Sequence, residues 1–87
     1  MSNEMKKLRK WLDANRIDWT DGTSYQGKMT IWRTYLFIKG TLVSVIYGFN
    51  TYGVRFGLLE MWIQDGEHEP EGWITAEQVI ERLEAIK

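Results

Sequence analysis

Cysteine is absent from this 87-residue chain, which also holds only one proline and one histidine. Without cysteine, disulfide bonds and thiolate metal sites are excluded. No apolar run approaches the roughly 18 residues that cross a membrane. No apolar stretch of the kind found in a signal peptide follows the first residues. These absences favour a cytoplasmic protein with no membrane partner.

Aromatic residues are plentiful and supply the bulk that a short chain needs. Five Trp, four Tyr and three Phe occur in the sequence. A chain of this length buries only about 60% of the surface that it exposes when unfolded, and each aromatic ring can bury roughly 150–250 Å². We expect residues 1–87 to form a single domain with an aromatic-rich core.

The central stretch predicts a long β-hairpin. Its arms are Met29–Ile38 and Thr41–Tyr47, both rich in β-branched and aromatic residues, and Lys39-Gly40 joins them. Glycine supplies the positive φ that a two-residue turn requires. Such a turn places Ile38 opposite Thr41 and fixes the pairing of all the residues before and after them.

Neither face of this hairpin is polar throughout. The first face carries Trp32, Thr34, Leu36, Ile38, Thr41, Val43, Val45 and Tyr47, and the second carries Ile31, Arg33, Tyr35, Phe37, Leu42, Ser44 and Ile46. An antiparallel sheet with one side in water alternates apolar and polar residues. The second face is therefore covered either by the chain itself, through the N-terminal strand or one helix, or by a partner.

The remaining elements predict an α+β fold. A helix capped by Ser2 or Asn3 runs to about Ala14, where Asn15 can end it in the left-handed conformation. Two further strands are expected at Arg16–Thr20 and Phe56–Ile63, and Gln64–Gly72 is expected to be a polar loop. A second helix follows a capping box of Thr75 and Gln78 and runs to about Ile86. We predict two layers, with both helices on the first face of an antiparallel sheet of three to four strands.

Catalysis has little support in the sequence. The single histidine, His68, lies in the acidic stretch Asp65-Gly66-Glu67-His68-Glu69, where it is expected to be a solvated bystander rather than a base. Those carboxylates do not follow the spacing of a calcium loop, and no glycine-rich phosphate loop occurs. We expect no enzyme activity, no cofactor and no metal.

Binding to another protein, or to a second copy of the chain, is the interpretation that the second face favours. Contiguous exposed apolar surface marks an interface, and aromatic and arginine side chains dominate binding energy. The expected binding residues are Arg33, Tyr35, Phe37, Leu42, Ile46, Phe49, Tyr52, Leu58 and Trp62.

Charge asymmetry supports an alternative, a nucleic-acid-associated protein. Residues 1–40 carry eight Lys or Arg against four Asp or Glu, whereas residues 41–87 carry three against eight. The first helix holds a basic set that could contact phosphates, namely Lys6, Lys7, Arg9 and Lys10.

Four segments carry a family resemblance. They are Val43-Ser44-Val45-Ile46-Tyr47-Gly48, Thr51-Tyr52-Gly53, Gly57-Leu58-Leu59-Glu60-Met61-Trp62 and Glu71-Gly72-Trp73-Ile74-Thr75-Ala76-Glu77. The chain resembles small uncharacterised proteins encoded by phages and prophages of Gram-positive bacteria. The resemblance implies an accessory protein in the cytoplasm of a bacterial host, one that acts by binding, for example as an inhibitor of a host enzyme or of a defence nuclease, as anti-CRISPR proteins do. It implies no catalytic residues.

Overall fold

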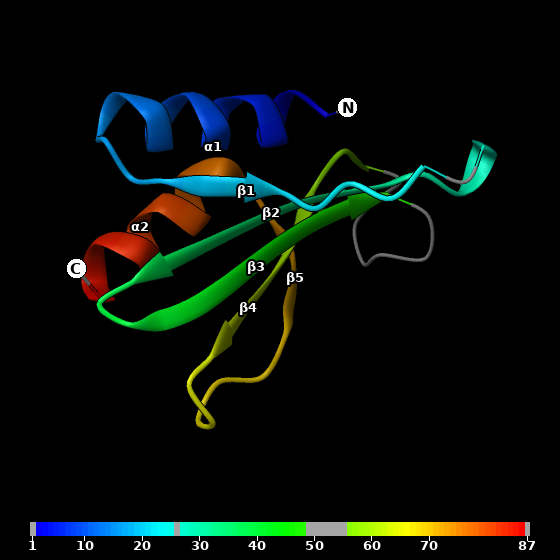
Figure 1. Ribbon diagram of the computed structural model, residues 1–87. Helices are drawn as coiled ribbons and strands as arrows, with labels where there is room; N and C mark the ends of the chain where they lie inside the picture. Colours follow the sequence, from blue (N-terminus) through cyan, green and yellow to red (C-terminus); the bar gives the residue numbers. More distant parts are fainter. Residues whose placement is uncertain (1, 26, 49–55, 87) are drawn as a thin grey trace.

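The computed structural model describes residues 2–25, 27–48 and 56–86, and it has the α+β architecture predicted from the sequence. Two helices lie on one side of a five-stranded antiparallel sheet with strand order β1-β2-β3-β4-β5 (Figure 1). The elements in chain order are α1 (Asn3–Ala14), β1 (Trp19–Asp21), the 3₁₀ helix η1 (Gly27–Met29), β2 (Ile31–Ile38), β3 (Thr41–Gly48), β4 (Leu59–Gln64), β5 (Glu71–Ile74) and α2 (Ala76–Ile86).

The hairpin of β2 and β3 has the predicted register. Ile38 lies opposite Thr41, and the pairing continues to Trp32 opposite Tyr47, whose rings are 5.7 Å apart. Lys39 and Gly40 both have positive φ, 49° and 78°, as a two-residue turn of type I′ requires. This turn matches the twist of the strands, so it holds both faces in the register that the alternation predicted.

The predicted start of the first arm is wrong by two residues. Met29 belongs to η1, which begins at Gly27 with φ 60° and is closed by a hydrogen bond from Thr30 Oγ1 to Gly27 O. The strand begins at Ile31. Its partner strand extends one residue beyond the prediction to Gly48, where a Cβ atom would lie 2.4 Å from Thr30 O. Only glycine fits this close approach of two backbones.

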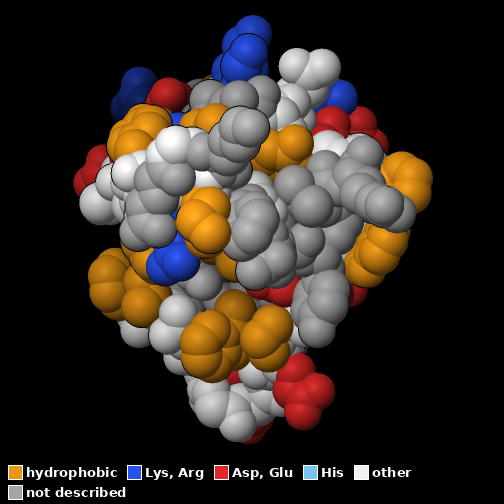
Figure 2. Space-filling model, turned by 90° about the vertical axis from the view of Figure 1, so that its right-hand side faces the viewer, with side chains coloured by type: hydrophobic (Ala, Val, Ile, Leu, Met, Phe, Trp, Pro, Cys, Tyr) orange, Lys and Arg blue, Asp and Glu red, His pale blue; other side chains and the backbone are white. Residues whose placement is uncertain are grey.

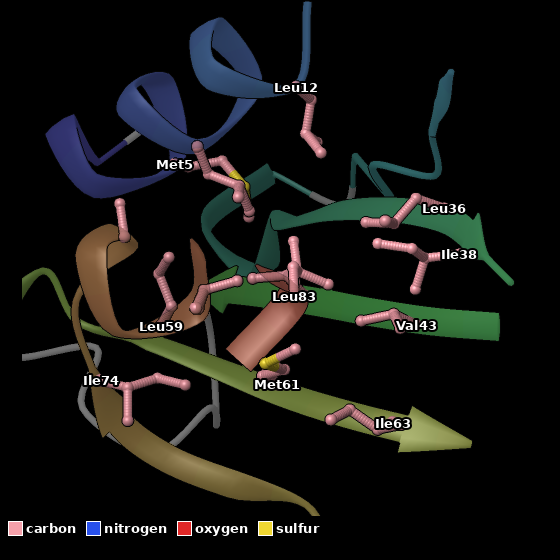
Figure 3. Close-up of a cluster of buried hydrophobic side chains, with 14 residues drawn as sticks. Met5, Leu12, Leu36, Ile38, Val43, Leu59, Met61, Ile63, Ile74 and Leu83 are labelled. Atoms are coloured by element: carbon pink, nitrogen blue, oxygen red, sulfur yellow. The ribbon is translucent and has the colours of Figure 1, made fainter. Parts of the chain in front are cut away.

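The core lies between the helices and the first face of the sheet, as predicted. Met5, Leu8 and Leu12 of α1 and Val79 and Leu83 of α2 are fully buried. They pack onto strand residues that alternate along the chain and include Leu36, Val43, Val45, Leu59 and Met61 (Figure 3). Burying one such side chain contributes roughly 1.5–3 kcal/mol, so this layer carries most of the stability of the domain.

Helix α1 begins as expected but ends differently. Ser2 is the N-cap, and its Oγ accepts a hydrogen bond from Met5 N–H. The left-handed residue after the helix is Arg16, with φ 58°, and not Asn15, whose φ is −97°. Ile17 N–H donates to Leu12 O and Arg16 N–H to Asp13 O, which is the Schellman arrangement. Asn15 instead donates its side-chain amide to Trp11 O.

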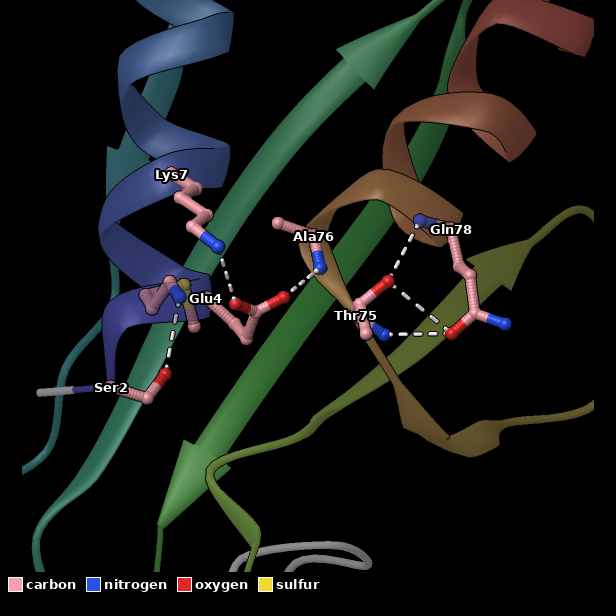
Figure 4. A network of polar contacts seen from close by, with 7 residues as sticks. Ser2, Glu4, Lys7, Thr75, Ala76 and Gln78 are labelled. Carbon is pink, nitrogen blue, oxygen red and sulfur yellow. Dashed lines mark hydrogen bonds and ion pairs between the residues drawn. The ribbon is translucent and has the colours of Figure 1, made fainter.

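Helix α2 begins at the predicted capping box. Thr75 N–H donates to Gln78 Oε1, and Gln78 N–H donates to Thr75 Oγ1. A third contact comes from α1, where Glu4 Oε1 accepts a hydrogen bond from Ala76 N–H (Figure 4). One carboxylate therefore joins the starts of both helices.

The sheet has five strands, one more than the upper limit of the predicted range of three to four. Glu71–Ile74, assigned in part to a polar loop, forms β5 and pairs with β4 across a bulge. Arg82 of α2 holds this edge by donating to both carboxylate oxygens of Glu71, at 2.7 and 2.5 Å. The other two predicted strands are each displaced along the chain: β1 is Trp19–Asp21 rather than Arg16–Thr20, and β4 is Leu59–Gln64 rather than Phe56–Ile63.

Candidate protein-binding surface

The second face of the sheet carries the residues that the alternation placed there. Strand pairing aligns them in rows, one of which runs from Thr20 through Tyr35 and Ser44 to Trp62. Tyr35 and Trp62 are thus two strand spacings apart, about 10 Å between backbones, with the small Ser44 between them. The neighbouring rows are Arg33, Ile46 and Glu60 on one side and Phe37, Leu42 and Gln64 on the other.

Both helices pack on the first face, so neither covers this second face (Figure 1). Phe37 is 67% exposed and Trp62 43% exposed. Arg33, Tyr35, Leu42, Ile46 and Leu58 are half-buried, the last of them just before β4. Phe49 and Tyr52 lie outside the described residues. We call Tyr35, Phe37, Leu42, Ile46 and Trp62 the apolar band.

Tyr35 is held in place by its neighbours. Its ring lies against Gly22, where an added Cβ would come within 2.2 Å of Tyr35 Cε2. Its hydroxyl oxygen accepts a hydrogen bond from Arg33 Nη1 at 3.2 Å. The Nε of Arg33 is buried and has no hydrogen-bond partner among the residues that the structure describes. Tyr35 therefore has a structural role in addition to any binding role.

Trp62 joins the band to the connection between β4 and β5. Its Nε1 donates to His68 O at 3.3 Å. Within that connection, the N–H groups of Glu67 and His68 donate to Asp65 Oδ1 and lower the pKa of this carboxyl to about 2. His68 Nδ1 lies 2.6 Å from Asp65 Oδ2. The connection between β4 and β5 is the lowest part of the molecule in Figure 1. In Figure 2, which is turned about the vertical axis, the lowest part of the molecule carries acidic side chains, and hydrophobic side chains lie above it.

The predicted basic set on α1 is divided by the fold. Lys6, Lys7 and Lys10 are exposed, and Lys7 pairs with Glu4 at 3.2 Å. Arg9 instead turns toward the sheet: its Nε donates to Thr34 Oγ1 and its Nη2 to Arg33 O, both at 2.9 Å. Its guanidinium also lies 4.7 Å from the centre of the Trp19 ring.

Sequence reasoning missed two features of this surface. The rings of Phe56, which precedes β4, and Trp73 of β5 are in contact, with centroids 5.4 Å apart and planes tilted by 39°, and both residues are more than half exposed. A cleft of about 550 Å³ opens beside Phe37, with Arg16, Asp18 and Lys39 among its lining residues. Neither could be read from the sequence, since the first depends on the undetected strand β5 and the second on the point where β1 separates from β2.

No group of three or more His, Cys, Asp or Glu side chains within residues 2–25, 27–48 and 56–86 is arranged to hold a metal ion. Over the same residues, no helix is long and apolar enough to span a bilayer. Comparisons of the chain with family models, with curated proteins and with solved structures find no significant match.

Proposed function

We propose that this chain is a non-catalytic accessory protein that acts by binding another protein through the second face of its sheet. The observation that carries the proposal is the exposure of Phe37 and Trp62 on a face that neither helix covers. Large apolar side chains that remain exposed on a rigid sheet are typical of an interface. The resemblance of segments such as Gly57–Trp62 to phage and prophage proteins supports a partner in the bacterial host, with inhibition of a host or defence factor as the outcome.

A second copy of the chain is the other partner to consider. A twofold dimer would bury the same band on both copies, and one charged residue of each sign, Arg33 and Glu60, lies in a single row with Ile46. Light scattering during size-exclusion chromatography across a range of concentrations separates a dimer from a monomer that binds a different protein.

The experiment compares three tagged proteins as baits in lysate of a Gram-positive host: the wild type, the double variant Phe37→Ser/Trp62→Ser, and Tyr25→Ser as the control. Tyr25 is 75% exposed but lies beyond the other end of β2. We expect the double variant to lose at least about tenfold of the captured partner or of the dimer. The control should retain both.

Equal capture by all three baits, together with a monomer at every concentration, would refute the proposal. The melting temperature of each variant shows whether it is folded. Phe37 is preferred to Tyr35 for this test, because the ring of Tyr35 also packs on Gly22.

Nucleic-acid binding through α1 is the alternative. The exposed lysines Lys6, Lys7 and Lys10 favour it, although Arg9 is engaged within the fold. Fluorescence anisotropy with labelled single- and double-stranded oligonucleotides over a salt series tests it, because phosphate contacts weaken steeply as salt rises. The absence of salt-dependent association would exclude this alternative.

A further inference from the structure

The second face of the sheet is arranged evenly about β3. This strand is the middle one of the five, and β2 and β4 both pair with it antiparallel, so these two neighbours run in the same direction (Figure 1). Each row of the second face therefore has one residue on β3 and one on either side of it. The rows are Arg33, Ile46 and Glu60, then Tyr35, Ser44 and Trp62, then Phe37, Leu42 and Gln64.

This arrangement suits a second copy stacked on the same face. A twofold axis that runs along β3, between the two sheets, exchanges β2 of one copy with β4 of the other. Because both strands run in the same direction, each row then faces the same row of the second copy. Sheets stacked in this way lie about 10 Å apart with their strands nearly aligned. The residues of β3 face their own equivalents across the axis, namely Leu42, Ser44 and Ile46.

Charges of opposite sign face each other in this arrangement. Arg33 faces Glu60 of the second copy, and the hydrogen bond from Arg33 Nη1 to the Tyr35 hydroxyl holds the guanidinium on this face. A carboxylate has about four acceptor sites, so Glu60 can accept from a guanidinium in addition to other donors. At one end of the sheet, Lys39 follows β2 and Asp65 follows β4, both exposed. The same exchange of strands brings Lys39 near Asp65 of the second copy.

The aromatic residues are matched as well. Tyr35 faces Trp62 of the second copy, and Phe37 faces Gln64, whose apolar stem can cover the ring. Phe37 and Trp62, exposed in the single chain, would thus be covered in both copies. No row places like charges opposite each other. A partner with an unrelated surface needs no such match between the two sides of β3, whereas a twofold dimer does.

The area of the face is sufficient for a dimer of modest affinity. Five strands span roughly 24 Å, and an average length of about six residues gives roughly 20 Å along the strands, or about 500 Å² of projected area on each copy. Two copies together would bury about 1,000 Å², which is near the lower limit for a specific interface. We therefore expect dissociation in the micromolar range.

We infer that the partner of the second face is a second copy of the chain, related by a twofold axis along β3, with Arg33 of each copy facing Glu60 of the other. The inference rests on the proposed function in taking the second face as the binding surface. It goes further in naming the partner and the pairs of residues that meet.

The test is sedimentation velocity of the full chain over a range of micromolar concentrations. The wild type should form a dimer as its concentration rises. Arg33→Glu and Glu60→Arg should each weaken the dimer at least about tenfold, because each sets two pairs of like charges face to face. An equimolar mixture of these two variants should restore association, since the mixed dimer has opposite charges in both pairs.

Matched controls make the same changes of charge on the helices. Lys10→Glu and Glu81→Arg alter exposed residues of α1 and α2, and both should leave the association constant within about twofold. Melting temperatures show which variants are folded. Leu42 provides a second test that leaves Arg33 and Glu60 intact. Leu42→Arg and Leu42→Asp should each weaken the dimer, since this residue meets its own equivalent, and a mixture of the two should restore it.

The inference is overturned if the wild type is monomeric at every concentration, if the mixtures associate no better than the single variants, or if the helix controls weaken the dimer equally. A monomeric wild type that captures a host protein, and loses it in Phe37→Ser/Trp62→Ser, overturns this inference and leaves the proposed function standing. A dimer unaffected by Phe37→Ser/Trp62→Ser, with no captured partner, overturns both.

Discussion

Glu4 and Ala76 are 72 positions apart in the sequence, yet Glu4 Oε1 accepts a hydrogen bond of 2.9 Å from Ala76 N–H. The N–H groups of a first helical turn have no partner within the helix and carry partial positive charge. The carboxylate satisfies one of them at the start of α2 while it belongs to the first turn of α1. This contact fixes the two helices relative to each other above the sheet.

Replacing Glu4 with alanine should lower the free energy of unfolding by about 1–2 kcal/mol, since it leaves a part-buried N–H without its acceptor. Glu4→Gln keeps an acceptor and should lose less. Glu81→Ala is the control, because Glu81 is an exposed glutamate of α2, and its effect should stay within about 0.5 kcal/mol. Urea denaturation measures all three. An equal loss from Glu4→Ala and Glu81→Ala would show that the contact is not stabilising.

Gly22→Ala should destabilise the fold by about 1–3 kcal/mol, because the added methyl group would overlap the ring of Tyr35. Combining it with Tyr35→Leu should recover part of the loss, so the two changes should not be additive. A double-mutant cycle in urea measures this coupling. Strict additivity would mean that the ring does not pack on Gly22.

Arg16→Gly should raise the free energy of unfolding by about 0.5–1 kcal/mol, since Arg16 occupies the left-handed position of a Schellman motif that glycine normally fills. Thermal unfolding measures the change, with Arg16→Lys as the control that retains the strain and the charge. A variant less stable than the wild type would indicate that the arginine side chain itself contributes to folding.

Asp65 should titrate with a pKa of about 2, well below its ordinary value of 3.8, because the N–H groups of Glu67 and His68 stabilise its charged form. A lowered pKa in the folded state favours folding at pH values above the ordinary pKa, and this contribution is lost as pH falls from about 4 toward 2. Carboxyl chemical shifts measured by NMR follow the titration. Asp65→Asn should remove the contribution of this residue to the pH dependence in that window, to which Asp21, whose pKa is also lowered, contributes separately. A midpoint near 4 for Asp65 in the wild type would contradict the account.

The sequence predicts the features that depend on short-range rules. The Lys39-Gly40 turn and the alternation around it were enough to fix the register of β2 and β3, and Thr75 with Gln78 marked the start of α2. Features that depend on contacts between segments far apart in the sequence were missed. Strand β5 holds Glu71 and Gly72, which read as loop residues, and it forms because β4 and Arg82 hold it.

The candidate surface was predictable to the same extent. Alternation placed Phe37 and Trp62 on one face, and the structure leaves both of them exposed. The cleft beside Phe37 was not predictable, because it requires the left-handed turn at Arg16 and the late start of β1 at Trp19. Such a turn was expected one residue earlier, at Asn15, where the side chain makes a different contact.

The central claim is that the second face of the sheet contacts a protein partner, and photo-crosslinking tests it most directly. A photoreactive phenylalanine analogue is placed at position 37 in one protein and at position 25 in another, and both are irradiated in cells of a Gram-positive bacterium. We predict one discrete crosslinked species from position 37, either with another protein or with a second copy, and none from position 25. The absence of an adduct from position 37, or the same adducts from both positions, would contradict the account.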